Sequence, residues 1–181
     1  MATLLDKLKS FLLKQKVKKL IGKKTRSLKL KELADVKTVG VVFDASTEDK
    51  YKSSAHLVRH FSSLKKKVNS IAITNTDILP AYVDTTLSFD YILNKEIKWF
   101  YYPDNKYVVD FVNNEFDLLV NLDFSDNPTL SFISNTSLAH LKVGIRNDNL
   151  DLDFMLEGIK DNDLKVFLKE LLKYLELIKT K

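Results

Sequence analysis

The sequence predicts an α/β protein, with a three-layer, Rossmann-like domain and a mostly parallel sheet of five or six strands. Apolar, β-prone runs alternate with amphipathic helical stretches from residue 38 to the end of the chain. Residues 116–122 are almost uniformly apolar, which is typical of a strand buried on both faces. Asn127 and Pro128 then mark a helix start, and 141–145 is a second apolar run. This stretch predicts a βαβ unit, whose neighbouring strands are parallel.

The other elements continue the same alternation, and each helix begins beside a side chain that can cap it. The predicted strands are 38–44, 68–73 and an edge strand at 152–156, and the helices follow Ser46 or Thr47, Asp104 or Asn105, and Asp161 or Asn162. The runs at 38–44 and 116–122 should form the centre of the sheet, because they are the most continuously apolar. Pro80 argues against a central strand nearby, so 82–91 is either an edge strand or an ordered loop. The aromatic run at 97–102 is β-prone.

The final helix has the clearest pattern in the chain, because its apolar residues keep a strict spacing of three and four. They are Leu164, Phe167, Leu168, Leu171, Leu172, Leu175 and Ile178. We expect this row to pack on the sheet.

Charge is divided unevenly along the 181 residues. Residues 1–35 hold eleven Lys or Arg and three acids, a net of +8, whereas residues 36–181 hold 18 basic and 21 acidic residues, a net of −3. The chain is therefore interpreted as a basic helical arm, 1–35, attached to one near-neutral α/β domain, 36–181. Cysteine is absent, which excludes disulfides and thiolate chemistry. Lysines interrupt every apolar run near the N-terminus, so we expect no secretory signal, no transmembrane segment and a cytoplasmic protein.

Residues 2–23 predict a helix with apolar side chains on two sides. The first group is Leu4, Leu5, Leu8, Phe11 and Leu12, and the second is Val17, Leu20 and Ile21. At about 100° per residue the two groups fall on nearly opposite faces. The pattern predicts two short amphipathic pieces or a bent helix, ending at Gly22.

Lysines interleave with these leucines, which favours a polyanionic partner. The candidate binding residues are Lys14, Lys16, Lys18, Lys19, Lys23, Lys24 and Arg26. We expect ribosomal or other structured RNA first, because lysines on several sides suit insertion among phosphates better than lying flat on lipid. An anionic membrane surface, an acidic protein groove and a solvated helix without a partner remain open alternatives, as does the oligomeric state.

A second candidate site lies where the predicted central strands end, since doubly wound sheets bind ligands beyond the carboxyl ends of their strands. The polar residues there are Asp44, Ser46, Thr47, Asp123, Ser125 and Asn127. Asp44 and Asp123 can converge on Mg²⁺ or a cationic ligand. Alternatively, each accepts hydrogen bonds from the helix start that follows it, which is the commoner use of such residues.

The usual catalytic patterns are missing from the sequence. The turn at 44–49 has no glycine to let a phosphate approach the backbone, and its carboxylates would repel one. His56 and His60 have the spacing of a helical metal pair but no evident third ligand, so we predict no metal and no cofactor. The sequence therefore predicts a non-catalytic binding or adaptor protein. The alternative is a nucleotide-sugar or Mg²⁺-dependent enzyme that uses Asp44 and Asp123.

Several pieces of the chain point to a family. They are Val-Gly-Val-Val-Phe-Asp-Ala at 39–45, Lys-Trp-Phe at 98–100 with Pro103, Phe-Asp-Leu-Leu-Val-Asn-Leu at 116–122 and Lys-Val-Gly at 142–144. With the basic N-terminal helix, they resemble an uncharacterised family of small bacterial proteins, a domain of unknown function, over most of the chain. The resemblance implies no activity. More distantly, the pattern at 117–122 and 141–144 is similar to the N-terminal half of heptosyltransferase-type glycosyltransferases, which bind sugar nucleotides mainly with a second domain, so this likeness implies the fold alone.

Overall fold

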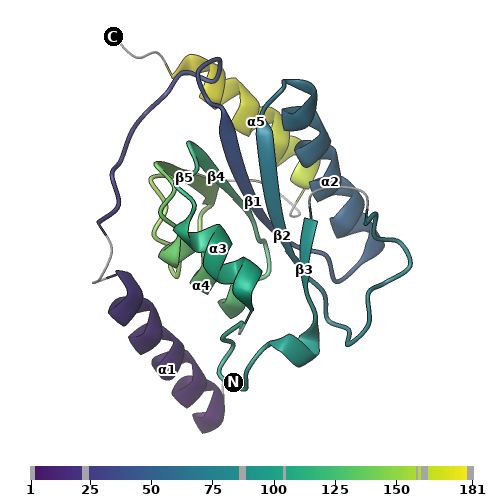
Figure 1. The fold of residues 1–181 in the computed structure, drawn as a ribbon, viewed down its shortest axis with the longest axis vertical. Coiled ribbons are helices and arrows are strands. Elements are labelled where there is room, and N and C mark those ends of the chain that lie inside the picture. The colour runs from purple at the N-terminus through teal and green to yellow at the C-terminus, as the bar shows by residue number, and fades with distance from the viewer. Residues whose placement is uncertain are drawn as a thin grey trace.

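The computed structural model describes residues 3–21, 25–85, 89–103, 105–157, 159 and 163–178. The strands of this part form one parallel sheet in the order β3-β2-β1-β4-β5-β6 (Figure 1). The strands are β1 (Thr38–Asp44), β2 (Lys67–Ile73), β3 (Phe89–Ile92), β4 (Leu118–Leu122), β5 (Leu141–Ile145) and β6 (Phe154–Leu156). The α-helices are α1 (Leu4–Ile21), α2 (Glu48–Ser63), α3 (Lys106–Asn113), α4 (Pro128–Thr136) and α5 (Leu164–Leu177). The predicted α/β, Rossmann-like fold is confirmed.

The two central strands, β1 and β4, lie side by side, as their continuous apolar runs predict. Every residue of β4 is buried, and so is every residue of β1 after Thr38. Gly40 lies opposite Leu119 in this pair, and a Cβ atom on Gly40 would meet the ring of Phe116 at 2.8 Å. A glycine is therefore needed here, because the aromatic ring packs directly on the strand backbone.

Helices cover both faces of the sheet (Figure 1). α2 and α5 pack on one face, where Phe61 and Phe167 are fully buried. α3 and α4 pack on the other face, with Phe111 and Ile133 in the core, and α1 lies against the outer side of α4. The apolar row of α5 faces the core, with Leu171 fully buried, which confirms the predicted placement of the last helix.

Two stretches differ from their predicted form. The N-terminal stretch is one continuous helix, α1, rather than two pieces, and its predicted end at Gly22 lies outside the described residues. The aromatic run at 97–102 is not a strand but a turn, closed by an antiparallel bridge between Ile97 and Pro103. Tyr101 in this turn has a φ of 65°, a left-handed conformation that breaks the extended backbone. Of the described residues in the stretch 82–91, those within β3 form a strand at the sheet edge.

The caps of α2 and α3 lie at predicted positions, whereas the cap of α5 differs from the prediction. Thr47 caps α2 by accepting a hydrogen bond from the Lys50 amide, and Asn105 holds the cap position of α3. The candidate caps Asp104, Asp161 and Asn162 lie outside the described residues. α5 is capped by Asp163, whose carboxylate accepts hydrogen bonds from the amides of residues 165 and 166.

Residues 25–37 contact the chain just ahead of β4, β5 and β6. The Arg26 guanidinium donates to the carbonyl oxygens of Ala139 at 2.6 Å and His140 at 3.0 Å, and forms an ion pair with Asp153. The Lys31 ammonium donates to Asp117 at 2.6 Å. We call residues 25–37 the N-terminal strap. It ties the basic segment to the body just ahead of β1.

The carboxylate of Asp117 joins the strap to both central strands. It accepts hydrogen bonds from the amides of Lys37 and Thr38, at 2.8 and 3.0 Å, besides the ammonium of Lys31. Burial acts to raise the pKa of Asp117, but these three donors outweigh it and lower the pKa to about 2. The carboxylate is therefore a stabilising charge at neutral pH.

We predict that Asp117→Asn lowers the free energy of unfolding by about 2 kcal/mol at pH 7. The ionised Asp117 contributes its full stability above the unfolded pKa of about 4, and this contribution is lost as the pH falls through about 2. The difference between wild type and variant, measured by urea unfolding, should therefore shrink between pH 5 and pH 2. A difference that stays constant over that range would contradict the ion pair.

We predict that Leu171→Asp unfolds the domain. The substitution places an unpaired charge in a fully buried site, at a cost of several kcal/mol against a total stability of about 5–15 kcal/mol. Val166→Asp is the matched control, because Val166 is on the same helix and 47% exposed. Thermal melting by circular dichroism should show loss of the transition for the first variant only. An unchanged melting temperature for Leu171→Asp would contradict the placement of α5.

Candidate functional site

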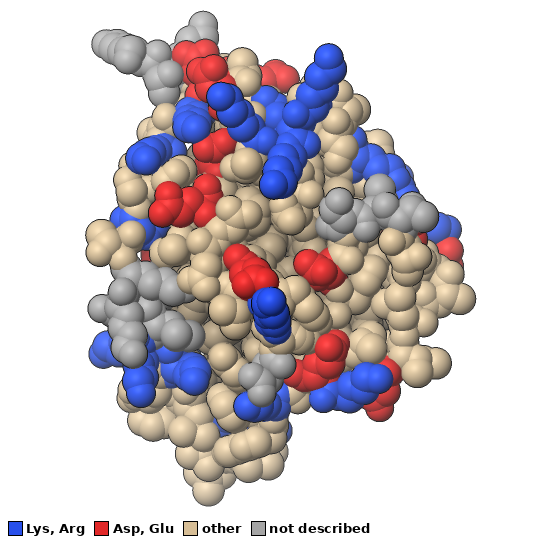
Figure 2. Space-filling model, viewed as in Figure 1, with Lys and Arg blue, Asp and Glu red and all other residues tan. Residues whose placement is uncertain are grey.

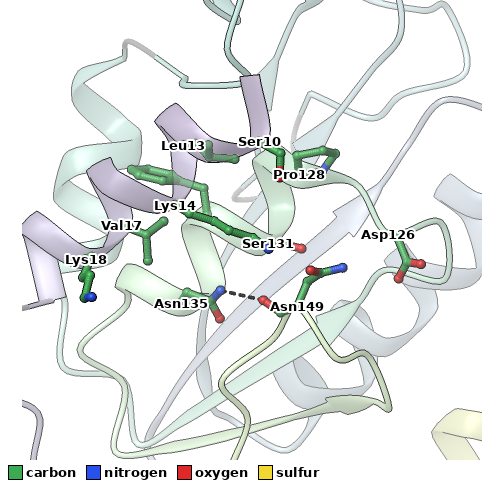
Figure 3. Close-up of a pocket in the computed structure, with 11 residues that line it drawn as sticks. Ser10, Leu13, Lys14, Val17, Lys18, Asp126, Pro128, Ser131, Asn135 and Asn149 are labelled. Atoms are coloured by element: carbon green, nitrogen blue, oxygen red, sulfur yellow. Dashed lines mark hydrogen bonds between the residues drawn. The ribbon is translucent and has the colours of Figure 1, made fainter. Parts of the chain in front are cut away.

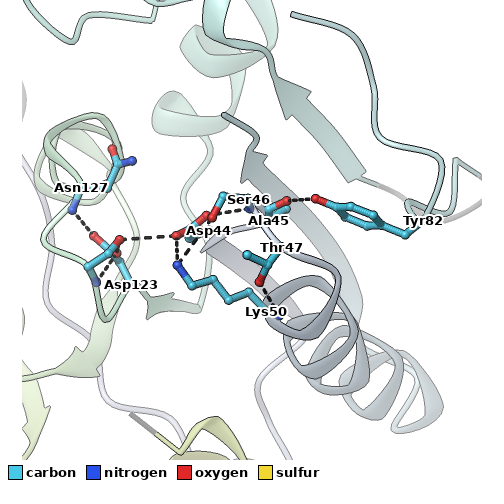
Figure 4. A network of polar contacts seen from close by, with 9 residues as sticks. Asp44, Ala45, Ser46, Thr47, Lys50, Tyr82, Asp123 and Asn127 are labelled. Atoms are coloured by element: carbon cyan, nitrogen blue, oxygen red, sulfur yellow. Dashed lines mark hydrogen bonds and ion pairs between the residues drawn. The ribbon is translucent and has the colours of Figure 1, made fainter. Parts of the chain in front are cut away.

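The first candidate site is the carboxyl edge of the sheet, where β1 and β4 end side by side. This is the topological switch point of the fold, since the strand order runs outward in opposite directions from this pair. Asp44 accepts hydrogen bonds from the Ser46 amide at 2.7 Å and from the Lys50 ammonium at 2.6 Å (Figure 4). Burial acts to raise the pKa of Asp44, but the hydrogen bonds from Lys50 and Ser46 outweigh it and lower the pKa.

Asp123 is used in a similar way by the loop that leads into α4. Its buried carboxylate accepts hydrogen bonds from the amide and hydroxyl of Ser125, at 2.8 and 2.7 Å, and from the Asn127 amide at 2.6 Å. Burial raises the pKa of Asp123, and the nearby charge of Asp44 adds to the rise. The Asn127 side chain in turn caps α4, accepting from the amide of Thr129 at 2.9 Å.

The sheet edge therefore brings together the predicted residues, but their polar atoms serve the chain's own loops. A cavity of about 400 Å³ opens beside Asp44 and is also lined by Lys50 and Ser125. Within the described residues, no group of three or more His, Asp or Glu is placed to hold a metal ion. His56 is exposed and His60 is half-buried on α2. The hydrogen bonds at this edge therefore hold the loops after β1 and β4 and cap the helices that follow, as the second of the two interpretations predicts.

The second candidate site is α1, which packs on α4 through one face. Leu13 is buried and Val17 is half-buried on that face. Two lysines extend the contact onto aromatic rings: the Lys9 ammonium lies 5.4 Å from the ring centroid of Tyr101, and the Lys16 ammonium lies 4.9 Å from that of Tyr102. The turn that contains these tyrosines thus supports the docked helix. This contact could not be predicted from the sequence, because the aromatic run that forms the turn has the composition of a β-strand.

The opposite face of α1 is apolar and uncovered. Leu4, Leu8 and Phe11 lie about half a turn of the helix away from Leu13. Their exposed fractions are 87%, 48% and 56%. We call these three residues the outer row. Among the side chains that the structure describes, Val17 of the second apolar group therefore lies against the body, while the outer row of the first group is open.

Lysines lie next to the outer row and toward the C-terminal end of α1. Lys7, Lys14, Lys18 and Lys19 are exposed. Throughout the described chain, Lys14, Lys18 and Lys19 make no ion pair. In Figure 2, blue side chains gather at the lower left, where α1 lies in Figure 1.

Of the other predicted binding residues, Lys16 is exposed but lies over Tyr102, and Arg26 is held by Asp153 and two carbonyl groups. Lys23 and Lys24 lie outside the described residues. Lys14, Lys18 and Lys19 are therefore exposed on α1, whereas Arg26 is held against the body.

The chain belongs to a family of unknown function: the model of that family (DUF6913) matches residues 9–178. This match confirms the resemblance to an uncharacterised family. No curated protein and no solved structure matches the chain. Of the helices in the described segments, none is long and apolar enough to cross a membrane.

Proposed function

We propose that this protein is a non-catalytic binding protein that attaches to an anionic lipid surface through α1. The observation that carries the proposal is the outer row, three exposed apolar side chains on the face of α1 that the body leaves open. Full burial of a leucine or phenylalanine side chain is worth about 1.5–3 kcal/mol. A lipid surface offers that burial to all three residues at once.

The lysines of α1 support the anionic character of the surface. Lys7 and Lys14 are exposed next to the outer row, and Lys18 and Lys19 continue the basic surface toward the end of the helix. A lysine near an anionic membrane contributes about 1 kcal/mol. Apolar insertion and charge attraction together therefore give a stable but reversible attachment. The body on the other side of α1 fixes the helix in the required orientation.

Structured RNA, including ribosomal RNA, is the second candidate partner. Three exposed lysines of α1 without an ion pair in the described chain support it, because such lysines neutralise phosphates: Lys14, Lys18 and Lys19. Binding to RNA, however, would leave the side chains of Leu4 and Phe11 exposed to water. Binding to either partner weakens with added salt, so salt dependence does not separate them.

We predict that the protein cosediments with vesicles containing phosphatidylglycerol and that Leu8→Glu weakens this binding at least about tenfold, because it removes apolar burial and adds a repelled charge. Val109→Glu is the matched control: Val109 lies on α3 and is 47% exposed, close to the 48% of Leu8. That variant should pellet like wild type.

Three outcomes would overturn the lipid proposal. Pelleting with ribosomes but not with vesicles would replace lipid by RNA. Equal loss in Leu8→Glu and Val109→Glu would show that binding does not use the outer row. Binding to neither particle would leave an acidic protein groove or a helix without a partner.

A further inference from the structure

A groove of about 440 Å³ runs between α1 and α4 (Figure 3). Its apolar lining comes from both helices: Leu13 and Val17 on α1, and Pro128 and Phe132 on α4. Lys14 and Lys18 line it from the α1 side. The volume is within the range of small-molecule sites, which are mostly apolar with a few charged groups.

The polar groups of the groove are distributed unequally. Lys14 and Lys18 have no ion-pair partner in the described segments. The acid that lines the groove, Asp126, already accepts a hydrogen bond from the Asn147 side chain at 2.6 Å. The groove is therefore basic along α1, and its acid is engaged with a neighbouring loop.

Ser131 adds an unsatisfied hydroxyl to the lining. The residue is 94% buried on α4, and its hydroxyl oxygen has no hydrogen-bond partner in the described chain. Its helix neighbour Asn135 is satisfied, donating to the carbonyl oxygen of Asn149 at 2.8 Å (Figure 3). A hydrogen bond to a ligand oxygen in the groove would satisfy this buried hydroxyl.

We propose that this groove binds one anionic amphiphile, a molecule with a single alkyl chain and a phosphate or carboxylate head. The chain lies on Leu13, Val17 and Phe132, and the head lies between Lys14 and Lys18. The inference rests on the proposed function in one respect, namely that an anionic lipid surface supplies the ligand. A free fatty acid or alkyl phosphate has the same chemistry, so the experiment separates the two sources.

The test is calorimetric titration of the full chain with dodecyl phosphate below its critical micelle concentration. We expect saturable binding at one site per chain, with no saturable binding of inorganic phosphate or of dodecyltrimethylammonium. The Lys14→Ala/Lys18→Ala variant should bind at least about tenfold more weakly, because it removes both charges from the head site. Equal binding of the cationic amphiphile would overturn the proposal.

Two groove-filling variants test the location. Val17→Trp fills the groove from α1, and Ser131→Leu fills it from α4. Because the second variant leaves the sequence of α1 unchanged, its result can be interpreted even if Val17→Trp disturbs the docking of α1. Each should lose dodecyl phosphate binding at least about tenfold. Unchanged affinity in Ser131→Leu would contradict the groove as the site.

The same variants separate this proposal from the proposed function. Leu8→Glu should lose vesicle binding and keep dodecyl phosphate binding, whereas Ser131→Leu should do the reverse. Wild type that pellets with vesicles but does not bind dodecyl phosphate overturns the groove proposal alone. Wild type that binds dodecyl phosphate but not vesicles overturns the membrane proposal and assigns the groove to a free amphiphile.

Discussion

The contact between α1 and α4 is the constraint on which the functional surface depends. Leu13 and Val17 face the body, and the ammonium groups of Lys9 and Lys16 lie over two tyrosine rings. Because this face is covered, the outer row on the opposite face points outward. A helix docked half a turn differently would bury Phe11 and its neighbours and turn Leu13 and Val17 outward instead. The way in which α1 docks on α4 therefore determines which of its side chains a partner can contact.

The N-terminal strap gives this helix a fixed point of attachment. Arg26 is bonded to Asp153 and to the carbonyl groups just ahead of β5, while Asp117 joins Lys31 to the beginning of β1. His140 adds a contact of 2.9 Å between its Nδ1 and the Ser27 carbonyl oxygen. Burial in this region lowers the pKa of Lys142, on β5, to about 8, with the charge of Arg26 acting in the same direction. The basic segment is thus built into the body over residues 25–37.

The sequence was sufficient for elements whose signal is local. Continuous apolar runs located β1 and β4, and the spacing of Phe167, Leu171 and Leu175 located α5. The sequence was insufficient where tertiary contacts determine the conformation or the orientation of an element. Two apolar groups on α1 are compatible with a bent helix or with one helix that meets a different apolar partner on each side. The packing of α1 on α4 decides between these two. The aromatic run at 97–102 forms a turn because a left-handed residue, Tyr101, overrides its β propensity. At the sheet edge both the residues and the commoner use of their carboxylates were predicted, since Asp44 accepts from the Ser46 amide and Asp123 from the amides of Ser125 and Asn127.

The outward orientation of α1 can be measured directly, because the chain has no cysteine and a single label is unique. Leu4→Cys places an environment-sensitive dye at the most exposed position of the outer row, and Val109→Cys places it on α3. On vesicles containing phosphatidylglycerol, we predict that the emission of the dye at position 4 shifts to shorter wavelength and saturates, while the dye at position 109 is unchanged. An unchanged emission at position 4 in protein that has pelleted with the vesicles would contradict the membrane orientation of α1.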